Sequence, residues 1–111
     1  MTISSNKEEQ LCVITISGEI DASSSIDLDS AISTALKKGE RKILVDCANL
    51  TYISSAGLGV FMSYLEDFEE QGIKIALYNM SDKVKSVFEI LGLVDLISIL
   101  STKEEAIAIV S

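Results

Sequence analysis

A chain of 111 residues has room for one domain of ordinary size, so we expect a single domain spanning residues 1–111. Its residues are 48% apolar, enough for a core, yet no apolar run reaches the roughly 18 residues that a membrane span needs. Nine basic residues against 17 acidic ones give a net charge of −8, which argues against nucleic acid and against insertion into or binding on a membrane.

The chain also lacks the side chains on which many enzymes and metal sites depend. It contains no histidine, so no Ser-His-Asp or Cys-His arrangement can form. Cys12 and Cys47 stand in separate apolar runs, where a cysteine usually serves as a small hydrophobic residue. We therefore expect no catalytic residue, no metal and no cofactor. The first seven residues lack the features of a signal peptide, so the predicted location is cytoplasmic.

In chain order, two strand-like runs come first. Thr2–Ser5 and Leu11–Ser17 flank a polar turn and predict an antiparallel hairpin. A helix should follow, with a serine of residues 23–25 as N-cap and Gly39 at its end. Its apolar stripe consists of Leu28, Ala31, Ile32, Ala35 and Leu36. The apolar run Lys42–Cys47 then predicts a strand covered by helices on at least one face.

Three more helices are predicted to alternate with two more strands. The second helix should end at Gly72 and bury Leu58, Phe61, Met62 and Leu65. The strand Ile73–Tyr78, a third helix with Val84, Val87, Phe88 and Leu91 on its apolar face, and the strand Leu96–Leu100 should come next. Thr102 and Glu105 form a capping-box pair that opens a last helix. The order ββαβαβαβα predicts an α/β fold: a mainly parallel sheet with an N-terminal antiparallel hairpin and four helices.

The segment from Asp46 to Gly59 carries the most specific signal. We expect a strand to end near Cys47, a loop to follow, and a helix to begin at about Ser54–Ala56. The small side chains there leave the first N–H groups of the helix open, and the positive end of the helix dipole favours an anion. A phosphate on a serine there would add about −1.5 to −2 charges and could block a partner. The alternative is that Ser54 or Ser55 is merely an N-cap.

A family resemblance runs through the same residues. The run Tyr52–Gly59, YISSAGLG, resembles the signature YIDSSGLG of the STAS domain family, which includes the anti-sigma factor antagonists. Gly18–Ala22 resembles the family's G-x-[LI]-D-x element before the first helix, and Phe88–Leu93 resembles the end of its third helix. The similarity extends in order and spacing from about Ile3 to Val110, and it implies the STAS fold.

The resemblance implies an anti-sigma factor antagonist that is not itself an enzyme and works by partner switching. The unphosphorylated form would bind an anti-sigma factor with serine kinase activity. Phosphorylation of a serine at the N-terminus of the second helix would release it, and a PP2C-type phosphatase would restore it. The motif maps the acceptor to Ser55. Ser54, which replaces the family's usual Asp, is the rival acceptor. The implied partner-binding residues are Asp21, Ser54, Ser55, Ala56, Gly57 and Leu58.

Several alternatives stay open. Asp46 stands late in a central strand, as the acceptor of a receiver-type domain would, although the acidic pair and the lysine that such a domain needs are missing. A STAS domain could also serve as an adaptor subunit of a membrane transport or other signalling complex. Asp21 could be a simple capping residue and Gly57 a simple turn-to-helix position. The acidic residues Glu66, Asp67, Glu69 and Glu70 are interpreted as a solvated helix face.

Overall fold

The computed structural model describes residues 1–111, and it confirms the α/β class and the order ββαβαβαβα. A short 3-10 turn, η1, precedes the last strand. The elements are β1 (Thr2–Glu8), β2 (Leu11–Ile20), α1 (Ser25–Lys37), β3 (Lys42–Ile53), α2 (Ser55–Gln71), β4 (Lys74–Tyr78), α3 (Asp82–Ile90), η1 (Leu93–Asp95), β5 (Ser98–Leu100) and α4 (Lys103–Val110).

The five strands form one sheet in the order β1-β2-β3-β4-β5. β1 and β2 are antiparallel, and all other neighbours are parallel, as predicted. The hairpin is longer than expected, because β1 runs to Glu8 and leaves only Glu9 and Gln10 in the turn. β1 is an edge strand that is exposed along nearly all its length. Its last three residues therefore lack the apolar pattern by which a strand is recognised in a sequence.

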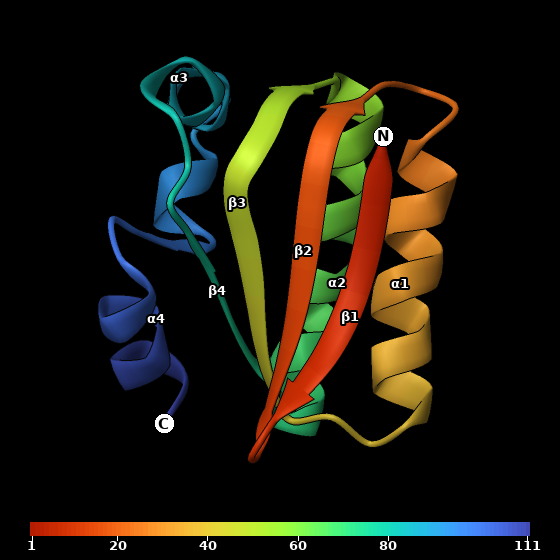
Figure 1. Ribbon diagram of the computed structural model, residues 1–111, viewed down its shortest axis with the longest axis vertical. Coiled ribbons are helices and arrows are strands. Elements are labelled where there is room, and N and C mark those ends of the chain that lie inside the picture. Colours follow the sequence, from red (N-terminus) through yellow and green to blue (C-terminus); the bar gives the residue numbers. More distant parts are fainter.

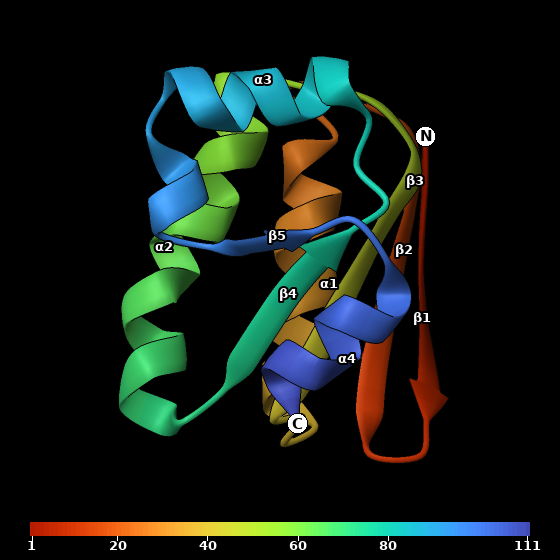
Figure 2. The same ribbon diagram turned by 90° about the vertical axis from the view of Figure 1, so that its left-hand side faces the viewer.

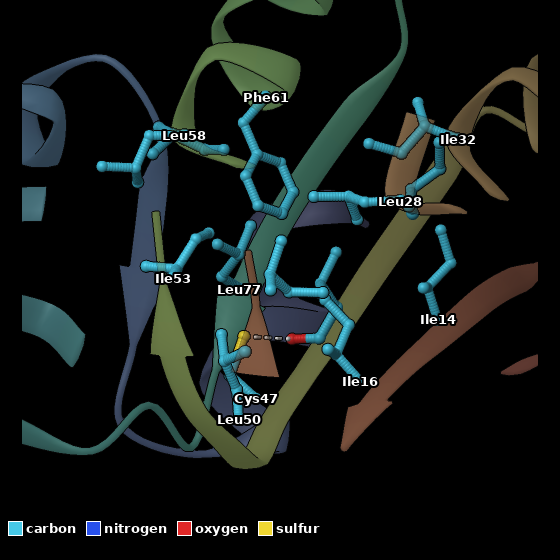
Figure 3. Close-up of a cluster of buried hydrophobic side chains, with 14 of the residues drawn as sticks. Ile14, Ile16, Leu28, Ile32, Cys47, Leu50, Ile53, Leu58, Phe61 and Leu77 are labelled. Carbon is cyan, nitrogen blue, oxygen red and sulfur yellow. Dashed lines mark hydrogen bonds between the residues drawn. The ribbon is translucent and has the colours of Figure 1, made fainter. Parts of the chain in front are cut away.

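The sheet is covered unequally on its two faces (Figures 1 and 2). α1 and α2 lie on one face and enclose the larger core, a cluster of 21 buried residues. α4 lies on the other face and packs Ala106 and Val110 against Val13, Leu44, Ala76 and Tyr78. Cys47 points into the larger core among Leu50, Ile53 and Leu77 (Figure 3), and burial raises the pKa of its thiol to about 12. Both cysteines are buried free thiols.

β3 departs most from the sequence prediction. It does not end near Cys47 but continues to Ile53 and pairs with β2 to the end. Two register shifts relative to β2 place Cys47, Leu50 and Ile53 in the core at intervals of three residues. This spacing is not that of a regular strand, so the bulged half of β3 looked like a loop.

Smaller differences concern the exposed apolar residues. Met62, predicted to be buried on the second helix, is 47% exposed, and Leu91 is exposed at the end of α3. The last strand begins at Ser98 and not at Leu96, because residues 93–95 form η1. The predicted capping box of Thr102 and Glu105 is present at the start of α4.

Candidate functional site

β2 and β3 end side by side at one edge of the sheet, with α1 and α2 following them. Their last residues, Ile20 and Ile53, are register partners, and the N–H of Ser54 donates to the carbonyl of Ile20 at 2.8 Å. Asp21 and Ser54 therefore follow directly on neighbouring strands, which lie about 4.8 Å apart in a sheet. The fold thus brings two separate sequence motifs to one edge.

Ser54 is the N-cap of α2. Its backbone is extended, and its hydroxyl accepts a hydrogen bond from the N–H of Gly57 at 3.3 Å. Its carbonyl accepts from the N–H of Leu58 at 3.0 Å, which begins the helical pattern. The half-buried Ser54 hydroxyl is thus already used by the helix.

Ser55 is the first residue of α2, and its side chain is exposed and takes no part in the cap. Ala56, the next residue, is also exposed and adds only a methyl group. The N–H groups of a helix's first turn have no acceptor within the helix and carry its positive dipole end. A charged group on Ser55 would therefore find both solvent and favourable electrostatics.

Gly57 and Leu58 lie beneath this surface. A Cβ on Gly57 would lie only 2.7 Å from Cγ2 of Ile20 and 2.8 Å from Cγ1 of Ile53. The missing side chain lets α2 pack directly on the ends of β2 and β3, and Leu58 fills the core next to it. Both residues, which the resemblance assigns to partner binding, are buried in the free chain, so they support the surface from below.

Asp21 holds the turn that leads into α1. Its Oδ1 accepts from the N–H of Ser24 at 2.9 Å, and the hydroxyls of Ser23 and Ser24 also lie 2.9 Å away. These bonds lower the pKa of the exposed Asp21 carboxyl to about 2. The hydrogen bond from the Ser24 N–H contributes most to this shift. Asp21 therefore carries a fixed negative charge. Ser24 is the N-cap by position, as predicted, but its side chain makes no capping bond because it is engaged with Asp21.

Two exposed apolar side chains at this end of the molecule were missed in the sequence. Ile26, in the first turn of α1, is 68% exposed, and Tyr52, two residues before Ser54, is 45% exposed. Ile26 lies off the apolar stripe of its helix, a signal that could have identified it. Tyr52 lies next to a bulge, and bulges re-aim side chains in ways that sequence does not reveal.

The surface around Ser55 is not a pocket. Of the five hollows on the molecule, none is lined by Ser54 or Ser55. The chain has no group of three or more acidic or cysteine residues placed to hold a metal ion. Small-molecule sites are usually concave, so an exposed helix start of this kind suits contact with another protein.

Asp46 does not occupy the place that a receiver-type domain requires. It lies within β3, seven residues before the strand ends, and its carboxylate accepts from the N–H of Ala48 at 3.0 Å. Its register partner on β4 is Tyr78, the last residue of that strand, but β3 itself continues past this point, so Asp46 is held within a strand that is paired with β2 on its other side. The α/β rule places functional groups beyond the carboxyl ends of the strands, so the geometry does not favour Asp46 as an acceptor.

Proteins similar to this chain in sequence or fold include anti-sigma factor antagonists. The anti-sigma-B factor antagonist of Staphylococcus aureus is 26% identical over 99 residues, which cover 89% of this chain and 92% of the relative. A crystal structure from Thermotoga maritima matches with a TM-score of 0.89 at 22% identity, covering 97% and 93% of the two chains. The Bacillus cell fate determinant SpoIIAA in its phosphorylated form matches with a TM-score of 0.72 at 26% identity, covering 96% and 97%.

A family model matches nearly the whole chain. The model of the STAS domain matches residues 2–106, which include the hairpin, the whole parallel sheet and the start of α2. None of the helices is both long and apolar enough to span a membrane. The extent of the match, together with the confirmed order of the elements, shows that the chain belongs to the STAS domain family.

Proposed function

We propose that this chain is an anti-sigma factor antagonist that works by partner switching, with Ser55 as its phosphorylation site. In the unphosphorylated form it binds an anti-sigma factor that is also a serine kinase. Phosphorylation by that kinase releases it, and a PP2C-type phosphatase returns it to the binding form. Support comes from membership of the STAS family and from the similarity to an anti-sigma-B factor antagonist.

The observation that carries the proposal is the different use of two adjacent hydroxyls. Ser54 caps α2, whereas Ser55 is exposed and free of the cap. Esterification of Ser54 would place a bulky dianion on the half-buried oxygen that accepts from the N–H of Gly57, and so would disturb the cap of α2. Esterification of Ser55 leaves the cap in place, so Ser55 is the acceptor that the fold tolerates best.

A phosphate on Ser55 would change the surface without a change of fold. It would add about −1.5 to −2 charges to an edge where Asp21 already carries a fixed negative charge. The positive end of the α2 dipole stabilises the phosphate where it is attached, so the phosphate would remain at the exposed start of the helix. A partner that packs closely against Ile26, Tyr52 and Ala56 would then meet a bulky, strongly hydrated dianion, and binding would be lost.

The test uses the full chain with the anti-sigma factor kinase of the same organism. Calorimetry should show that Ser55→Asp weakens binding by about tenfold or more. Ser55→Ala should bind like the wild type, but ATP should not release it. Incubation of the phosphorylated wild type with the phosphatase should restore binding.

Ser54→Ala is the matched control. Intact-mass analysis after incubation with kinase and ATP should find one phosphate on Ser54→Ala and none on Ser55→Ala. The reverse pattern would show that Ser54 is the acceptor. If Ser54→Asp and Ser55→Asp both leave binding to the cognate kinase unchanged, partner switching by this edge is wrong.

A further inference from the structure

A groove with an apolar lining lies at the other end of α2. It has a volume of about 600 Å³, and seven of its eleven lining residues are hydrophobic. The elements around it are the C-terminal half of α2, the beginning of β4, the segment entering β5, and α4 (Figure 2). A hollow of this size accommodates several side chains of a bound segment.

The groove exists because the sheet is incomplete at its edge. β5 pairs with β4 only from Ser98 onward, opposite Ala76. Lys74 and Ile75, the first two residues of β4, therefore have no neighbouring strand on that side. Residues 93–95 form η1 and not a strand, so β5 begins only at Ser98. The space beside the first residues of β4, between α2 and α4, is therefore not filled by a strand.

Large apolar side chains on two sides of the groove are exposed to solvent. Leu96, which leads into β5, is 58% exposed, and Ile109, on α4, is 46% exposed. Leu65 and Ile75 between them are only partly buried. Apolar side chains of separate elements that line one groove mark an interaction site more often than scattered exposed ones do.

The charged side chains that line the groove are negative on balance, with two carboxylates against one ammonium. Glu66 and Glu69 line it, and neither takes part in the two ion pairs of the chain, Lys7–Glu40 and Lys103–Glu8. Lys74 is the one cation of the lining, and its ammonium donates to the carbonyl of Ser111 at 3.1 Å. At the end of α2 the guanidinium of Arg41 already donates to the carbonyl of Gln71, so the excess negative charge of the groove comes from the two glutamates. A cationic group would be favoured here.

We propose that this groove is a second docking site, which takes a segment of a partner protein with large apolar side chains and Lys or Arg beside them. The apolar side chains enter the groove, and the cations pair with Glu66 and Glu69. These residues lie 11 and 14 positions beyond Ser55, or about 16–21 Å along the helix. The site is thus separate from the phosphorylation edge and can be filled in either phosphorylation state.

The test uses the full chain labelled with ¹⁵N and three short synthetic peptides of equal length. One alternates Leu and Lys in an amphipathic pattern, one replaces every Lys by Glu, and one replaces every Leu by Ser. Only the Leu/Lys peptide should shift the amide signals of Glu69, Ile75, Ile97 and Ile109 in a saturable way. Ser55→Asp should bind it equally well, which separates this result from any failure of the proposed function.

Charge reversal on α2 supplies matched variants. Glu66→Lys with Glu69→Lys should weaken binding of the Leu/Lys peptide by about tenfold. Asp67→Lys with Glu70→Lys makes the same change on exposed residues of the same helix outside the groove, and should have a much smaller effect. Ile109→Ser, at an exposed position, should also weaken binding.

Four results would overturn the proposal. They are the absence of saturable shifts in the groove, equal weakening by the two charge reversals, equal binding of the Leu/Glu peptide, and groove signals that move on dilution of the chain alone. The last result would mean that a second copy of the chain covers the groove.

Discussion

At the residue scale, Gly57 shows how closely α2 approaches the sheet. Gly57→Ala would force a methyl group against Ile20 and Ile53 at 2.7 and 2.8 Å, below any normal contact. Because both neighbours are buried, relief requires a shift of α2, and we expect a loss of about 1–3 kcal/mol in the free energy of unfolding. Urea denaturation measures this loss.

Gly59→Ala is the control for that substitution. A Cβ at Gly59 meets nothing within 4 Å, and the position lies within the same helix. Replacement of a helical glycine by alanine should stabilise the chain by roughly 0.5–1 kcal/mol. Equal effects of the two substitutions would show that α2 does not rest on the strand ends through Gly57.

Asp21 gives a prediction about pH. Its pKa is lowered from 3.8 to about 2 in the folded chain, so its charged form is stabilised by folding. That contribution is present above the pKa of the unfolded chain and is lost as the pH falls from about 4 to 2. The difference in Tm between the wild type and Asp21→Asn should therefore shrink over this range. A difference that stays constant from pH 6 to pH 2 would contradict the hydrogen bonds assigned to Asp21.

At the scale of elements, replacement of the two serines at the start of α2 should change the free energy of unfolding by different amounts. Ser54→Ala removes the acceptor of the Gly57 N–H and should lower the free energy of unfolding by about 1 kcal/mol. Ser55→Ala should leave it nearly unchanged, because Ser55 takes no part in the cap. Thermal or urea denaturation of both variants measures the difference. A larger loss for Ser55→Ala would contradict the assignment of the cap.

The elements also show what the sequence could reveal. The helix starts and ends were visible, since Thr102 with Glu105, Gly39 and Gly72 act locally. The second half of β3 was not visible, because its register depends on bulges opposite β2, and these arise only when the two strands are paired. In the same way, periodicity placed Met62 on the apolar face of α2, but whether anything covers it depends on the tertiary arrangement.

The candidate site was predictable to a similar degree. The family motif located Ser54, Ser55 and Asp21, whose approach follows from the pairing of Ile20 with Ile53. The motif could not show that Ser54 is the cap and Ser55 is exposed, because that distinction rests on backbone geometry. Nor could it show that Gly57 is buried, since its contacts come from two different strands.

On the scale of the whole molecule, α2 connects the two surfaces. Its N-terminus carries the proposed phosphorylation site, and its C-terminal half forms a wall of the apolar groove. Between them the helix is fixed by Leu58, Phe61 and Phe68 in the larger core. A helix packed in this way keeps a constant distance between the surfaces, so we expect occupation of one proposed site not to disturb the other.

The exposure of the Ser55 side chain has a consequence for timing. A phosphate on Ser55, as proposed, would push no packed neighbour aside, so we expect no rearrangement inside the chain to delay its addition or removal. Under the proposed function, the duration of the signal would then be set by the turnover of the kinase and the phosphatase. The state of Ser55 would then report only which of the two enzymes acted last.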